Sequence, residues 1–67
     1  MFIISENNPL GYASKQTRTN NIRDIYDIVL NITGNEKEAQ WATETASDMG
    51  FGRQYERSRY KLECVRV

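Results

Sequence analysis

Hydrophobic positions change their spacing along the chain, and each change predicts a new element. The chain opens with a β-forming run from Phe2 to Ile4, which predicts a short strand over about residues 2–5. Residues 6–20 begin with a turn-rich stretch and continue as a polar, threonine-rich segment without a helical stripe. We expect this segment to be either a loop or a loop that contains a second short strand.

A helical period begins near Asn21. Apolar residues then recur three and four positions apart, as on one face of a helix; they are Ile22, Ile25, Val29 and Ile32. Asn20 or Asn21 can cap the start of this helix, and Gly34 suits the left-handed position that closes one. The pattern predicts a helix over about residues 21–33.

A second helix is predicted over about residues 35–49. Asn35 is a good N-cap, and Glu38, three residues later, would complete a capping box. The apolar stripe of this helix consists of small residues and one methionine, namely Ala39, Ala42, Ala46 and Met49. Such a stripe buries little area but allows another backbone to approach closely. We expect Gly50 to terminate the helix and Phe51 to fold back onto its last turn.

The C-terminal part of the chain has a period of two and predicts a strand over about residues 54–66. One face is apolar and carries Tyr60, Leu62 and Cys64. The other face is charged and carries Arg57, Arg59, Lys61 and Glu63. The whole sequence therefore predicts a single α+β domain over residues 1–67, a β-α-α-β unit with both helices on one face of a two- or three-stranded, mainly antiparallel sheet.

The composition argues against catalysis. The 67 residues include no histidine and one cysteine, so the commonest general base is absent and no intramolecular disulfide can form. Cys64 falls on the apolar side of its strand, where a buried core residue is expected. We expect no enzyme activity, no cofactor and no metal. The short apolar start is neither a signal peptide nor a membrane span, which predicts a cytoplasmic protein with no membrane partner.

Charge is neutral in total but sorted along the chain. Residues 34–52 carry a net charge of −3, and residues 53–67 carry +3. Such a distribution affects partner choice more than fold. Trp41 lies off the alanine stripe, so it either covers the edge of the core or forms an exposed anchor of the kind enriched at binding hot spots. Candidate partner-binding residues are the aromatic and charged side chains of this half: Trp41, Glu44, Asp48, Phe51, Tyr55, Arg57, Arg59 and Lys61.

Residues 32–67 resemble a class of very small proteins of Firmicutes and their phages. The resemblance consists of a helix that opens with G-[DN]-E-x-E-A, a glycine-containing turn and a Y-E pair that leads into a terminal strand. The matching residues are Gly34, Asn35, Glu36, Glu38, Ala39, Trp41, Ala42, Gly50, Gly52, Tyr55 and Glu56. This resemblance implies an accessory protein of a phage or mobile element and assigns no functional residue. The basic residues of the last strand depart from the acidic ends of that class.

Together these features favour a small binding protein that docks on a bacterial host protein and inhibits or modulates it. A host defence nuclease is one target, because carboxylates can mimic phosphates in a nucleic-acid channel. Nucleic-acid binding through Arg57, Arg59 and Lys61 is the alternative from another class. A related alternative is a ribbon-helix-helix-like arrangement, in which residues around Lys15 and Arg18 precede two helices. A third alternative is a self-assembling module that forms a homodimer.

Overall fold

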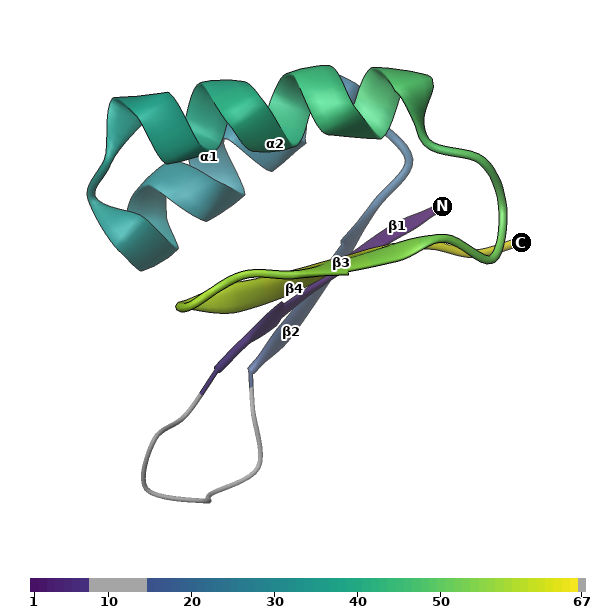
Figure 1. The fold of residues 1–67 in the computed structure, drawn as a ribbon, viewed down its shortest axis with the longest axis horizontal. Helices are drawn as coiled ribbons and strands as arrows, with labels where there is room; N and C mark the ends of the chain where they lie inside the picture. The colour runs from purple at the N-terminus through teal and green to yellow at the C-terminus, as the bar shows by residue number, and fades with distance from the viewer. Residues whose placement is uncertain (8–14, 67) are drawn as a thin grey trace.

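The computed structural model describes residues 1–7 and 15–66, and it has the predicted α+β architecture (Figure 1). Strands β1 (Phe2–Glu6) and β2 (Gln16–Thr19) precede helices α1 (Ile22–Thr33) and α2 (Glu36–Asp48), which are followed by β3 (Gln54–Glu56) and β4 (Tyr60–Cys64). The four strands form one antiparallel sheet in the order β2-β1-β4-β3, one strand more than the largest sheet expected. Both helices cover the same face of this sheet.

The alternation of side chains along β1 and β4 builds the core. Phe2 is paired with Cys64, and Ile4 is paired with Leu62. All four side chains are buried beneath the helices, with Ile25 and Val29 of α1 and the three alanines of α2 above them. The alanine stripe allows close approach of the two helices, as the sequence predicts. Cys64 is a buried free thiol, as expected from its position.

Within the segment that the sequence leaves open, residues 16–19 form an edge strand. β2 pairs with β1 so that Thr17 lies opposite Ile4 and Thr19 lies opposite Phe2. The half-buried threonines face the helices, while Gln16 and Arg18 are exposed on the other side. Residues 8–14 of the predicted loop lie outside the described residues.

The single strand predicted over residues 54–66 is wrong, because this segment is a β-hairpin. Arg57 donates its backbone N–H to the carbonyl of Tyr60 at 2.8 Å, which closes a tight turn with Ser58 and Arg59 at its tip. An uninterrupted strand would place Arg57, Arg59 and Lys61 on one face, but the two-residue turn shifts the alternation by one position. Arg57 therefore lies on the same face as Tyr60 and Leu62. The tip also lacks the Asn-Gly or Asp-Gly pair that usually reveals such a turn in a sequence.

The predicted helix starts are confirmed, but one capping detail is wrong. The side chain of Asn21 accepts from the Arg23 backbone N–H, and that of Asn35 accepts from the N–H groups of Lys37 and Glu38. Gly34 closes α1 with a φ of 66°. The Glu38 carboxylate does not complete a capping box. It points to the β3–β4 hairpin instead, where it binds Arg57.

The end of α2 also differs from the prediction. Met49 is the C-cap in an extended conformation, and the positive φ of 83° occurs at Gly52 rather than Gly50. Arg53 donates its N–H to the Gly50 carbonyl at 3.2 Å, while Gly52 donates to the Cys64 carbonyl and Cys64 donates to that of Arg53. This is a turn that leads directly into a glycine bulge at the start of β3.

None of the helices in residues 1–7 and 15–66 is long and apolar enough to cross a membrane.

Candidate functional site

The side of the molecule formed by α2 and β3 brings together most of the candidate residues. Arg57, next to the hairpin turn, forms a two-pronged ion pair with Glu38 of α2, with Nε–Oε1 and Nη2–Oε2 distances of 3.0 and 2.6 Å. The buried Tyr60 donates its hydroxyl to Oε1 of Glu38 at 3.3 Å. Planar bidentate pairing fixes both side chains in one geometry. The pair therefore ties α2 to the hairpin.

Trp41 lies one turn further along α2, between an arginine and a tyrosine. The Arg57 guanidinium lies 4.1 Å from the centroid of the indole ring, in a cation–π arrangement. Tyr55 of β3 meets the same ring edge to face, with a centroid distance of 6.0 Å and an interplanar angle of 89°. Trp41 is half-buried and packs against the core. Of its two expected roles, the structure shows the one at the edge of the core.

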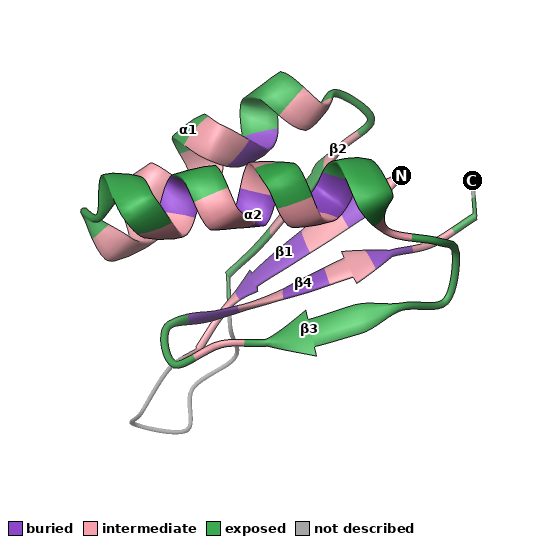
Figure 2. Cartoon of the chain, turned by 45° about the horizontal axis from the view of Figure 1, so that its top comes forward, coloured by how far each residue is buried: buried purple, intermediate pink, exposed green. Residues whose placement is uncertain are grey.

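Two other aromatic residues, one in β3 and one in the turn between α2 and β3, are exposed. Tyr55 has 39% of its surface exposed although it faces the helix side of the sheet, and Phe51 has 62% exposed. They are the exposed large hydrophobic residues of the part of the chain described here. Figure 2 shows that β3 is exposed along its whole length while α2 lies over the inner strands. We call Trp41, Phe51 and Tyr55 the aromatic surface.

Phe51 does not fold back onto the last turn of α2, as was expected from the sequence. It occupies the turn between α2 and β3, and the guanidinium of Arg66 lies 5.3 Å from the centroid of its ring. The reason is the extended backbone at Met49, which directs the chain away from the helix.

Charged groups in the cluster are held in fixed ionisation states. Hydrogen bonding by Arg57 lowers the pKa of the Glu38 carboxyl below its ordinary value despite the opposing effect of burial. Burial, reinforced by the negative charge of Glu38, raises the pKa of the Tyr60 hydroxyl to about 12. Both shifts keep the ion pair charged and the phenol neutral through neutral pH.

The cationic row expected on one face of a strand does not form. Arg57 turns toward α2, whereas Arg59 donates from Nη2 to the carbonyl of Ile32 at the end of α1, at 3.2 Å. Lys61 lies on the helix-free face of the sheet, with its Nζ 3.4 Å from a carboxylate oxygen of Glu63. The three cations therefore point in three directions, and each has a partner within the chain.

The acidic residues of α2 are distributed differently from the prediction. The carboxylate that binds the hairpin is Glu38, which the sequence assigned to helix capping. Glu44 accepts a hydrogen bond from Gln40 one turn earlier at 3.3 Å, and Asp48 is exposed. Neither forms an ion pair with the hairpin among residues 1–7 and 15–66. The negative charge on the outer side of α2 is thus only partly neutralised.

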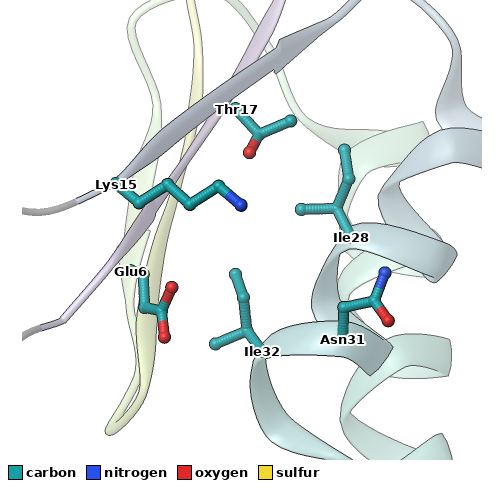
Figure 3. A pocket seen from close by; sticks show the side chains of 6 residues that line it. All are labelled: Glu6, Lys15, Thr17, Ile28, Asn31 and Ile32. Atoms are coloured by element: carbon teal, nitrogen blue, oxygen red, sulfur yellow. The ribbon is translucent and has the colours of Figure 1, made fainter.

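The sequence gives no indication of a pocket that lies near the opposite edge of the sheet, on the β2 side (Figure 3). This pocket has a volume of about 270 Å³ and lies between the β1–β2 end and α1. Its lining combines isoleucines with polar and charged groups: Glu6, Lys15, Thr17, Ile28, Asn31 and Ile32. The described residues contain no group of three or more acidic, histidine or cysteine side chains that could hold a metal ion.

Comparisons with protein-family models, curated proteins and solved structures gave no match to this chain.

Proposed function

We propose that this chain is a small cytoplasmic binding protein that acts by docking on another protein rather than by catalysis. The observation that carries the proposal is the aromatic surface. Tyr55 is exposed beside Trp41, and Phe51 is exposed in the turn between α2 and β3. Exposed aromatic residues beside a rigidly held tryptophan are typical of binding hot spots.

Rigidity of this surface supports the proposal. Trp41 is held by the Arg57 guanidinium on its face and by Tyr55 at its edge, and Arg57 is itself held by Glu38. Side chains that are already ordered lose little conformational entropy on binding, so more of the contact energy contributes to affinity. A purely structural cluster would be expected to bury Tyr55 and Phe51 more completely.

The residues available for chemistry also favour docking over catalysis. The sequence contains no histidine, and the thiol of Cys64 is buried within the sheet. The carboxylate with a shifted pKa, Glu38, is occupied by Arg57 and stays ionised. Such a group neither donates nor accepts protons near neutral pH.

We propose a bacterial protein as the partner and an accessory phage or mobile-element protein as the origin of the chain, on the basis of the sequence resemblance in residues 32–67. Inhibition of a defence nuclease stays one form of this proposal. Because Glu38 is paired with Arg57, phosphate mimicry would depend on the exposed carboxylates Glu36, Glu44 and Asp48.

Affinity capture from a bacterial lysate, with and without nuclease treatment, tests the proposal. We expect the wild-type protein to recover a partner protein that survives nuclease, and the Phe51→Ser and Tyr55→Ser variants to lose most of it. Gln16→Ser is the matched control, because Gln16 is exposed on the opposite edge strand. Capture of nucleic acid alone, or equal capture by the aromatic variants and the control, would contradict docking through this surface.

A further inference from the structure

We propose that β3 pairs with β3 of a second copy of this chain around a two-fold axis at Tyr55. The proposal rests on the proposed function, since it names a partner for the same aromatic surface. It starts from the backbone of β3, which is an edge strand of three exposed residues. An edge strand with unpaired backbone groups is a template for pairing with another strand.

Hydrogen bonding within the hairpin determines which backbone groups of β3 point outward. Arg57 donates to the Tyr60 carbonyl, and Cys64 donates to that of Arg53. Residues 53 and 57 therefore direct their polar groups toward β4, and the period of two gives Tyr55 the same direction. The N–H and carbonyl groups of Gln54 and Glu56 point away from the sheet. They are the groups that a fifth strand would bind.

If β3 of a second copy pairs antiparallel with β3 around an axis at Tyr55, all of these N–H and carbonyl groups form hydrogen bonds. Gln54 then lies opposite Glu56 of the second copy, and Glu56 lies opposite its Gln54. Each such pair exchanges two backbone hydrogen bonds, so the dimer gains about four backbone hydrogen bonds in total. The amide side chain of Gln54 also lies beside a carboxylate and can donate to it, on the helix-free face where Gln54 and Glu56 flank Glu63 and Lys61.

Tyr55 is the residue that this arrangement explains best. It pairs with the buried Leu62 and so faces the helix side, yet 39% of its surface is exposed. On the axis it would lie opposite Tyr55 of the second copy in a non-hydrogen-bonded pair, the position where opposing side chains are closest. Both rings would be covered by the two Trp41 side chains. An aromatic cross-strand pair of this kind contributes roughly 0.2–1 kcal/mol beyond an alanine pair.

Other registers fit less well. An axis at Glu56 would place two glutamates directly opposite each other, which is destabilising. An axis at Gln54 would place Glu56 opposite Gly52, which lies in the turn before the strand. In the Tyr55 register like charges meet only where Arg53 lies opposite Arg57 of the other copy, once on each side of the axis. The charge of Arg57 is already neutralised by Glu38.

The other edge strand, β2, is less suited to pairing with a second copy than β3. The corresponding residue of β2 is Thr17, which is half-buried and much smaller than tyrosine, and Arg18 lies beside it. A cationic residue on an edge strand opposes strand addition. The short length of β3 makes the expected interface small, so we expect a weak dimer that forms on the order of 100 μM protein.

Sedimentation velocity over protein concentrations from about 10 μM to about 1 mM tests the proposal directly. We expect a reversible monomer–dimer equilibrium that Gln54→Glu weakens and Gln54→Lys strengthens, each several-fold, because the new charge meets Glu56 of the second copy twice. Gln16→Glu and Gln16→Lys make the same changes on β2 and should leave the equilibrium unchanged. Amide hydrogen exchange at Gln54 and Glu56 should slow as the dimer forms.

A monomer at all concentrations would overturn the proposal, as would a dimer in which the Gln54 and Glu56 amides stay unprotected. Equal effects of the Gln54 and Gln16 substitutions would also contradict it. The lysate capture separates this result from the proposed function. A monomer that still loses its partner through Tyr55→Ser leaves docking on another protein intact, whereas a monomer without Tyr55-dependent capture contradicts both. If the dimer exists, a target protein must displace the second copy from β3.

Discussion

Asn7, the residue after β1, donates from Nδ2 to the backbone carbonyl of Arg57 at 2.8 Å, across a sequence separation of 50 residues. The same nitrogen lies 3.3 Å from the Ser58 carbonyl, and the Asn7 backbone N–H donates to Arg59 at 2.9 Å. One asparagine therefore holds the whole turn of the β3–β4 hairpin. Because Arg57 begins this turn, Asn7 also positions the guanidinium that binds Glu38 and covers Trp41.

Replacing Asn7 with alanine should release the turn while keeping the backbone bond to Arg59. We expect a loss of about 1–2 kcal/mol in the free energy of unfolding, since two carbonyls lose their side-chain donor. Urea denaturation followed by tryptophan fluorescence measures it. Asn20→Ala, at an exposed bend before α1, is the control. A loss no larger than that of the control would show that the β3–β4 turn is stable without the Asn7 side chain.

Arg57→Lys tests whether the geometry of the guanidinium matters beyond its charge. Lysine retains the charge but cannot form the two-pronged bond to Glu38 or stack as a plane on Trp41. We expect a loss of about 1 kcal/mol in stability, reduced by the partial exposure of both side chains. Arg53→Lys, at an exposed arginine just before β3, should change little. Equal stability of the two variants would argue against a specific role for the bidentate Arg57 guanidinium.

Acid should weaken the α2–hairpin contact through Glu38. The folded state lowers the pKa of this carboxyl below its ordinary value of 4.5. Its stabilising effect is therefore complete above that value and is lost as the pH falls through the folded pKa. Glu38→Gln should accordingly be less stable than the wild type at pH 7, and the difference should shrink on acidification. Thermal melts of both proteins between about pH 7 and pH 3 measure it; a constant difference would contradict it.

Alkali should act through Tyr60. Its hydroxyl has a pKa of about 12 in the folded chain, against an ordinary value of 10.0. The folded state thus favours the neutral phenol, and the resulting stability is present below pH 10 and is lost as the pH rises toward 12. In Tyr60→Phe this loss should disappear. Denaturant titrations of both proteins at a series of alkaline pH values measure the free energy of unfolding. An equal loss of stability in Tyr60→Phe and the wild type would contradict a role for the phenol.

Two glycines only two positions apart should respond differently to alanine. Gly52 has a φ of 83°, where a side chain is strained, so Gly52→Ala should cost about 1 kcal/mol or more. Gly50 has no positive φ, and a Cβ there would meet nothing within 4 Å. Gly50→Ala should therefore be neutral or slightly stabilising. Calorimetric melting temperatures give both values, and a cost at Gly50 as large as that at Gly52 would contradict the assigned turn.

The sequence predicts the parts of this fold that depend on local periodicity. The stripe from Ile22 to Ile32 and the N-caps Asn21 and Asn35 give both helices within one or two residues. The hairpin at Ser58 and Arg59 is not predicted, because the polar residues from Arg57 to Glu63 alternate in sequence like one face of an uninterrupted strand. The two-residue turn instead shifts the alternation by one position. Local pattern also assigned Glu38 to helix capping, while the structure uses it to bind a residue 19 positions away.

In the candidate site, too, residue types can be identified from the sequence, whereas their contacts depend on packing. Trp41, Tyr55 and Arg57 were identified from residue type, and the structure brings them together. Arg59 and Lys61 were grouped with Arg57 by spacing alone, and the hairpin separates them. The partners of these cations, the Ile32 carbonyl and Glu63, depend on how helices and strands pack. The pocket beside Lys15 depends on packing in the same way, since its lining comes from β1, β2 and α1.

The central position of β1 has a consequence for the kinetics of folding. β1 pairs on one side with β2, a neighbour in sequence, and on the other side with residues 60–64, and Phe2 is matched with Cys64. The sheet therefore closes only after a loop of more than 50 residues, from Glu6 to Tyr60, has been brought together, which slows the search for the native state. A nascent chain that has not yet exposed β4 cannot cover β1. We expect folding of the domain to follow the emergence of residue 64 from the ribosome.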